Sequence, residues 1–157
     1  MDFQRPDQGS QTTWQNELIA GVRDQFSLLL GVTPLGMIFG ALAVSSGISG
    51  PVAQGFSLFV FAGSSQFIAL DLIRRGGHAF IVVLTIFVVN LRHFLYSATM
   101  AAYYRRLPIR WRLGLAWLLT DEAFAMTSLR YRAADLTHAH WYALGSGMAL
   151  FLAWQGS

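Results

Sequence analysis

The chain has 157 residues, of which 54% are hydrophobic and only 12% are charged, whereas soluble domains carry about 25% charged residues. This composition argues against a soluble globular core and favours one compact helical membrane domain. The net charge of +3 is the difference between eleven basic residues, all of them arginine, and eight acidic ones. The arginines lie mostly beside apolar segments, which is typical of topology signals and lipid-headgroup contacts and not of a nucleic-acid patch.

The N-terminal residues 1–15 are polar and predict a flexible tail, so that residues 16–157 form the single membrane domain. No basic stretch followed by an apolar one occurs in the first 20 residues, so the first transmembrane helix is expected to direct insertion. Residues 14–24 then predict a short amphipathic helix at the membrane surface. Its apolar side carries Trp14, Leu18 and Val22, and its other side carries Glu17, Arg23 and Asp24.

The first apolar segment, residues 26–46, contains Pro34. Proline removes a backbone hydrogen bond and clashes with the preceding turn, so a kink or break is expected there. Either Pro34 only adjusts helix packing, or it marks a discontinuous helix that exposes backbone polar groups to a substrate.

The second segment, residues 52–70, has four small or polar residues in mid-span, namely Gly63, Ser64, Ser65 and Gln66. Serine hydroxyls can bond to their own helix, so they indicate little alone. The Gln66 amide needs partners in a dry environment. It either faces a substrate pathway or joins two helices.

The third segment, residues 79–104, is 26 residues long and has Asn90, Arg92 and His93 near its centre. About 20 helical residues cross a bilayer core, and a central arginine costs at least about 2.5 kcal/mol. Arg92 must therefore face protein, water or a counter-charge. His93 is interpreted either as a packing residue or as a proton relay.

The fourth segment, residues 111–129, is interrupted by Asp121 and Glu122, and the fifth covers residues 141–157. Adjacent helical residues lie about 100° apart, so one carboxylate can meet Arg92 while the other faces a cavity. The pair favours proton coupling, because a like-charged neighbour makes protonation easier. The alternative is a buried salt bridge that fixes helix register.

Loops after the second, third and fourth segments all carry arginine, and five simple spans cannot place all three on one side. We therefore predict an all-α polytopic membrane protein with about five transmembrane or re-entrant helices, at least one of them discontinuous. The break is expected at Pro34 or at residues 90–92. The basic loop at residues 105–112 is the best candidate for the cytoplasmic side.

Few other chemistries are indicated. No histidine has the carboxylate spacing of a three-ligand metal site, and no phosphate-binding loop with lysine occurs, so we expect no metal, cofactor or nucleotide. An intramembrane hydrolase that uses Ser65 and His93 remains an alternative.

Four ordered motifs then stand out. They are GVTPLG at residues 31–36, FAGSSQF at 61–67, VNLRHFLY at 89–96 and LTDEAF at 119–124. Together they resemble the AzlC family of branched-chain amino-acid permeases, and residues 145–157 resemble that family's next helix. The resemblance implies a multi-pass protein of the bacterial inner membrane that exports valine, leucine, isoleucine and sometimes methionine, driven by the proton-motive force. It also implies a small AzlD-type membrane subunit. Family members are longer at the C-terminus, so the domain is expected to be incomplete there.

We hypothesise that Arg92, with free backbone amides near Pro34 and Gly63, receives the substrate carboxylate. Asp121 or Glu122 receives the ammonium group or the coupling proton. Three aromatic residues are candidates for the aliphatic pocket, namely Phe39, Phe67 and Phe94. The alternative to a carrier is a membrane scaffold subunit. The expected partners are small hydrophobic amino acids, the lipid bilayer, the second subunit and a further copy of the chain.

Overall fold

The computed structural model describes residues 13–133 and 137–157, and it is helical in every element of those ranges. This confirms the predicted all-α class. The predicted tail lies almost wholly outside the described residues and stays a prediction. The helices are α1 (Trp14–Ser45), α2 (Gly50–Phe59), α3 (Gly63–Arg74), α4 (Ala79–Tyr104), α5 (Ile109–Leu118), α6 (Asp121–Ala133) and α7 (Ala139–Gly156).

Helix α1 runs without interruption for 32 residues, from its cap at Thr13 and through Pro34. Two predictions are therefore wrong: residues 14–24 are not a separate surface helix, and Pro34 does not break the helix. The physical reason is packing against α7 on both sides of the proline. A Cβ atom at Gly21 would lie 2.2 Å from the carbonyl oxygen of Tyr142, and Gly36 lies beside Trp154. Close contact along the helix holds it together despite the lost hydrogen bond.

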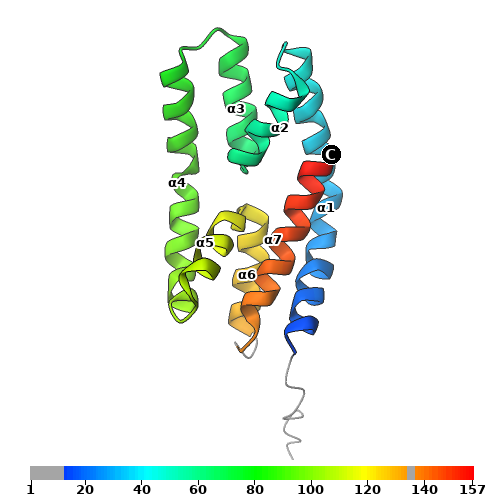
Figure 1. Ribbon diagram of the computed structural model, residues 1–157, viewed down its shortest axis with the longest axis vertical. Coiled ribbons are helices and arrows are strands. Elements are labelled where there is room, and N and C mark those ends of the chain that lie inside the picture. Colours follow the sequence, from blue (N-terminus) through cyan, green and yellow to red (C-terminus); the bar gives the residue numbers. More distant parts are fainter. Residues whose placement is uncertain (1–12, 134–136) are drawn as a thin grey trace, which may run out of the picture.

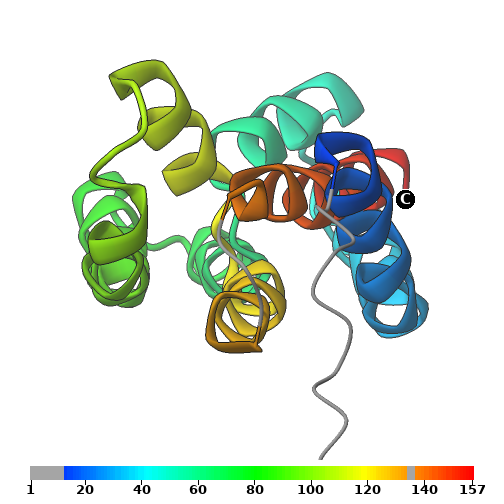
Figure 2. The same cartoon turned by 90° about the horizontal axis from the view of Figure 1, so that it is seen from below.

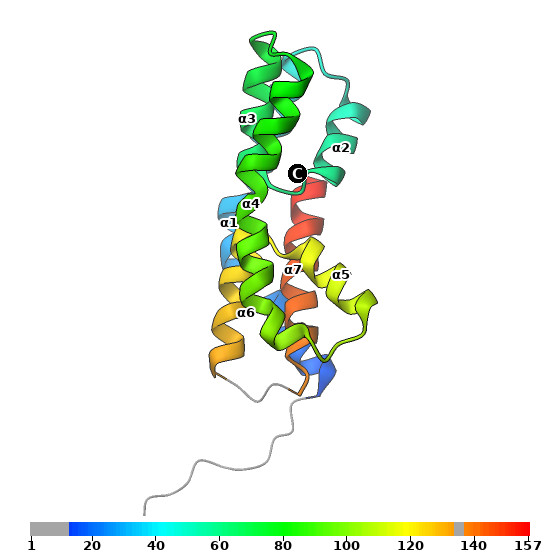
Figure 3. The same cartoon turned by 90° about the vertical axis from the view of Figure 1, so that its left-hand side faces the viewer.

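The second and fourth segments are each split into two short helices that form a hairpin. The break between α2 and α3 is at residues 60–62, and the break between α5 and α6 is at residues 119–120. In Figures 1 and 3, α2 runs from the upper end to mid-height and α3 returns to the upper end. The α5–α6 hairpin does the same from the lower end. In a bilayer such hairpins are re-entrant, and their non-helical turns must be buried in protein or line a cavity.

The positions of these breaks correct the prediction in a second way. Helix α4 is continuous across residues 90–92 and has the predicted bounds, residues 79–104. The polar residues at its centre are therefore side chains of an intact helix, and the irregular backbone belongs to the hairpins packed beside it.

The elements α1–α2–α3 and α4–α5–α6 repeat one pattern in opposite orientations. Each unit is a long helix of 32 or 26 residues, then a helix of 10, then one of 12 or 13. The long helix runs upward in the first unit and downward in the second (Figure 1). Figure 2 shows α7 in the middle of the bundle, with α1 on one side and α4 on the other. This is the arrangement of an inverted repeat.

The hairpins bring two of the three arginine-bearing loops to one end and leave the loop after α3 at the other. Because α5 and α6 enter and leave at the same end, residues 105–112 and 130–132 lie together at the lower end (Figure 1). Arg74 and Arg75 lie at the upper end. Helices α1 and α4 are each long and apolar enough to cross a bilayer.

Candidate functional site

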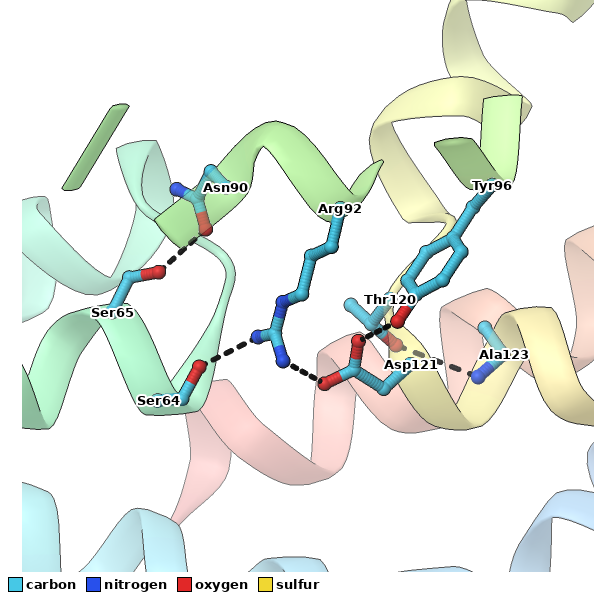
Figure 4. Close-up of polar contacts among 8 residues, drawn as sticks. All are labelled: Ser64, Ser65, Asn90, Arg92, Tyr96, Thr120, Asp121 and Ala123. Carbon is cyan, nitrogen blue, oxygen red and sulfur yellow. Dashed lines mark hydrogen bonds and ion pairs between the residues drawn. The ribbon is translucent and has the colours of Figure 1, made fainter. Parts of the chain in front are cut away.

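Arg92 lies at the middle of α4, where the tips of the two hairpins meet (Figure 4). Its Nη1 atom is 2.6 Å from Oδ2 of Asp121, and its Nη2 atom donates to Oγ of Ser64 at 2.6 Å. Ser64 belongs to the first turn of α3, and Asp121 is the first residue of α6. The positive charge of Arg92, which needs a partner inside a membrane, is thus paired with a carboxylate of the protein itself.

Tyr96 is the second side chain that binds the Asp121 carboxylate. Its hydroxyl donates to Oδ1 at 2.8 Å, so both carboxylate oxygens have partners. The Tyr96 ring stacks on Phe124 of α6, with centroids 4.4 Å apart and ring planes 10° apart. Sequence reasoning missed Tyr96. The signal was present, because Tyr96 follows Arg92 by four residues and therefore shares its helix face.

Both α3 and α6 begin at this level, so their N-termini point toward the centre of the bundle (Figure 4). The first N–H groups of a helix lack partners within the helix and form the positive end of its dipole. No side chain caps α3, whereas in α6 the Thr120 hydroxyl accepts a 3.5 Å bond from the Ala123 amide. Two helix dipoles and Arg92 therefore favour an anion at this point, and Asp121 and Glu122 oppose them.

A cavity of about 300 Å³ opens at this junction. The polar part of its wall consists of Ser64, Arg92, His93, Thr120, Asp121 and Glu122. The apolar part includes Val32, Leu35, Phe61, Phe67, Leu150 and Trp154. The Nε atom of Arg92 and the Nε2 atom of His93 have no hydrogen-bond partner among the described residues. Both atoms are buried. The cavity itself has charged and hydroxyl groups beside an apolar wall, as small-molecule sites do.

Four of the residues predicted at the site do not line this cavity. Gln66 is fully buried and donates to the carbonyl of Val60, the residue that ends α2, so it stabilises the hairpin turn. Ser65 donates to Asn90 at 2.5 Å and joins α3 to α4. Pro34 lies between the lining residues Val32 and Leu35 without contributing to the wall. Gln66 is not free for a ligand, since its side chain replaces a lost backbone bond at the break. Ser65 and Asn90 are held by each other.

The three aromatic residues predicted for the aliphatic pocket lie at different distances from the cavity. Phe67 lines the cavity, and Phe39 packs behind it with ring centroids 5.8 Å apart. Phe94 is 73% exposed and does not line this cavity.

The hydrolase alternative gains nothing from this geometry. Ser65 bonds to Asn90 and not to His93, so the contact between nucleophile and base is missing. Within residues 13–133 and 137–157, no three histidine, aspartate or glutamate side chains come together as a metal site would need.

Comparison with protein families decides the classification. The model of the family described as "AzlC protein" matches residues 27–157. The chain belongs to the AzlC family. That match covers α4, both hairpins and every residue of the cavity wall.

Individual relatives agree. An uncharacterized membrane protein of Helicobacter pylori (strain ATCC 700392 / 26695) is 37% identical over 73% of this chain and 51% of its own length. An uncharacterized membrane protein of Archaeoglobus fulgidus is 32% identical, over 87% and 57%. The inner membrane protein YgaZ of Escherichia coli K12 is 29% identical, over 70% and 45%. The chain thus spans about half the length of the curated relatives it matches. No solved structure matches it. It is a helical membrane protein that belongs to a transport-related family.

Proposed function

We propose that this protein is a subunit of a secondary transporter that exports small hydrophobic amino acids, namely valine, leucine, isoleucine and sometimes methionine. The observation that carries the proposal is the central cavity, in which one arginine, two carboxylates and two helix N-termini face an apolar wall. A zwitterionic amino acid with an aliphatic side chain needs a cationic partner for its carboxylate, an anionic partner for its ammonium group and an apolar surface for its side chain. Inverted repeats with broken helices bind their substrates at mid-membrane in many transporters.

The mechanism follows from the competition for Arg92. Without substrate, Asp121 supplies the counter-charge. A substrate carboxylate takes over Arg92, aided by the free amides at the start of α3. The ammonium group then pairs with Glu122 or with the released Asp121. In this hypothesis a proton on either carboxylate replaces the ammonium group in the return step, which couples export to the proton gradient.

We infer the orientation from the arginines and the location from the family. We place the protein in the bacterial inner membrane as a multi-pass protein, with the lower end of Figure 1 in the cytoplasm. The connection at residues 105–112 and the end of α6 carry six arginines there, namely 105, 106, 110, 112, 130 and 132, against 74 and 75 at the upper end.

The test is flux of labelled leucine in proteoliposomes, with and without an imposed pH gradient and with and without an AzlD-type subunit. We expect leucine flux that the gradient accelerates and that Glu122→Gln abolishes. Gradient-independent flux in the wild type and in Glu122→Gln alike would contradict proton coupling. No flux in any arrangement would contradict the carrier and leave the scaffold role, whether the chain assembles with the second subunit or with further copies of itself.

A further inference from the structure

The two repeat units contribute opposite walls to the central cavity. The second unit supplies all its charged lining residues, from Arg92 and His93 on α4 to Asp121 and Glu122 on α6. The first unit, α1 to α3, supplies no charged lining residue. The repeat therefore places a charged wall on one side and a neutral wall on the other.

The neutral wall has an apolar part on α1, at the same level as Arg92 on α4. Val32 and Leu35 lie three residues apart and so share a helix face. Helix α7 extends this surface with Leu150. A ligand whose charged groups lie against the second unit thus has its remaining atoms directed toward α1.

We propose that Leu35 is a specificity-determining residue that contacts the substrate side chain and sets its permitted length. This rests on the proposed function, because it names the part of the same cavity that selects among aliphatic α-amino acids. The charged wall holds the ammonium and carboxylate groups that all α-amino acids share. Discrimination among them must come from the opposite wall.

Leu35 differs from the other apolar wall residues in its freedom to change. Val32 and Leu150 are buried at 8% and 2% exposure and belong to a core cluster that also contains Trp154. Leu35 is 48% exposed although it lines the cavity. Substitution of Leu35 therefore alters the volume open to a ligand with little disturbance of the core, and the other two positions combine packing with lining.

The experiment measures how alanine, valine, methionine and phenylalanine compete with labelled leucine for the purified protein in nanodiscs. Leu35→Ala should shift the preference toward methionine and phenylalanine by about tenfold, and Leu35→Phe should shift it toward alanine and valine by a similar factor, since a methylene group in a pocket is worth about 10–200-fold. Opposite shifts at one position cannot arise from partial unfolding.

The matched control is Ile38→Ala. Ile38 is on the same helix and is 49% exposed, but it does not line the cavity. Its preference order should equal that of the wild type. If leucine binds and the order is unchanged in both Leu35 variants, or changes equally in Ile38→Ala, the specificity role of Leu35 is overturned and the transport function is not. If the wild type binds none of these amino acids, both proposals are overturned.

Discussion

The two hairpins are alike in shape and unlike in how they are held. The lower hairpin is fixed by ion pairs at both ends of α6: Asp121 pairs with Arg92 of α4, and Arg130 forms a two-pronged pair with Glu17 of α1. The upper hairpin is joined to α4 by the hydroxyls of Ser64 and Ser65. Its own ion pair, Asp71 with Arg75, is exposed and lies within one chain segment.

This difference in bonding predicts that the two hairpins differ in how they respond to ligands and protons. Bonds between charged groups are strong, but a competing ion or a proton can release them. A hydroxyl donor or acceptor has no such switch near neutral pH. We therefore expect α6 to be the element that responds to substrate and protons, with α3 as the comparatively fixed counterpart.

The largest expected effect on stability comes from Glu17→Gln. Glu17 is 1% exposed, and its loss leaves Arg130 without its counter-charge. Breaking a buried pair costs about 3–5 kcal/mol, and the partial exposure of Arg130 reduces this to about 2–3 kcal/mol. Equilibrium unfolding in mixed micelles measures the free energy. The matched change in the upper hairpin, Asp71→Asn, breaks the exposed pair with Arg75 and should alter stability by less than about 0.5 kcal/mol. Equal losses in both variants would remove the contrast between the hairpins.

The next comparison is between the two partners of Arg92. Asp121→Asn removes the counter-charge, and Ser64→Ala removes a hydroxyl at the same guanidinium. We expect leucine flux to fall at least about tenfold in the first variant and about threefold in the second, because the first loses a full counter-charge and the second loses one hydrogen bond. Initial rates at equal protein content provide the measurement, and the reverse order would argue that the upper hairpin is the responsive one.

A smaller effect is expected at Ser65→Ala, which deletes the partly buried bond to Asn90. Stability should fall by about 1 kcal/mol, the usual net value of one hydrogen bond. Leucine flux should stay close to the wild-type rate, because neither residue lines the central cavity. A loss of flux without a loss of stability would mean that this bond takes part in transport.

The substitutions with the smallest expected effect test whether the two hairpins open toward opposite ends of the molecule. The chain has no cysteine, so Arg75→Cys and Arg106→Cys each introduce a single thiol at a helix end, the first at the upper end and the second at the lower (Figure 1). An impermeant thiol reagent added to intact cells should label position 75 and reach position 106 only after the membrane is opened. Labelling of both positions from one side would refute the membrane crossing of α4, which lies between the two hairpins.

Local patterns predicted α4 to the residue, because an apolar run of the right length is bounded by His78 and by the basic stretch that follows Tyr104. They also indicated that Arg92 needs a partner and that Asp121 was a candidate. The turn at residues 60–62 was not predictable, since Val60, Phe61 and Ala62 are all apolar and the side chain of Gln66 stabilises the break.

Contacts between distant segments set the remaining limits. The burial of Glu17 depends on Arg130, 113 residues away, and the uninterrupted helix through Pro34 packs against α7. A propensity rule sees neither contact, so the residues around Glu17 looked like a polar surface and Pro34 looked like a break. Tertiary packing overrode local preference in both places.

The most direct test of the account is a binding titration of leucine against the wild type and Arg92→Gln. Two probes accompany it, isoamylamine, which lacks the carboxylate, and 4-methylpentanoate, which lacks the ammonium group. We predict that the wild type binds leucine at least about tenfold more tightly than either probe, because each charged contact is worth more than about 1.4 kcal/mol. Arg92→Gln should lose the advantage of leucine over isoamylamine and keep its advantage over 4-methylpentanoate, because only the carboxylate contact is removed. Leucine affinity that is unchanged in a folded Arg92→Gln protein would contradict the assignment of the central cavity.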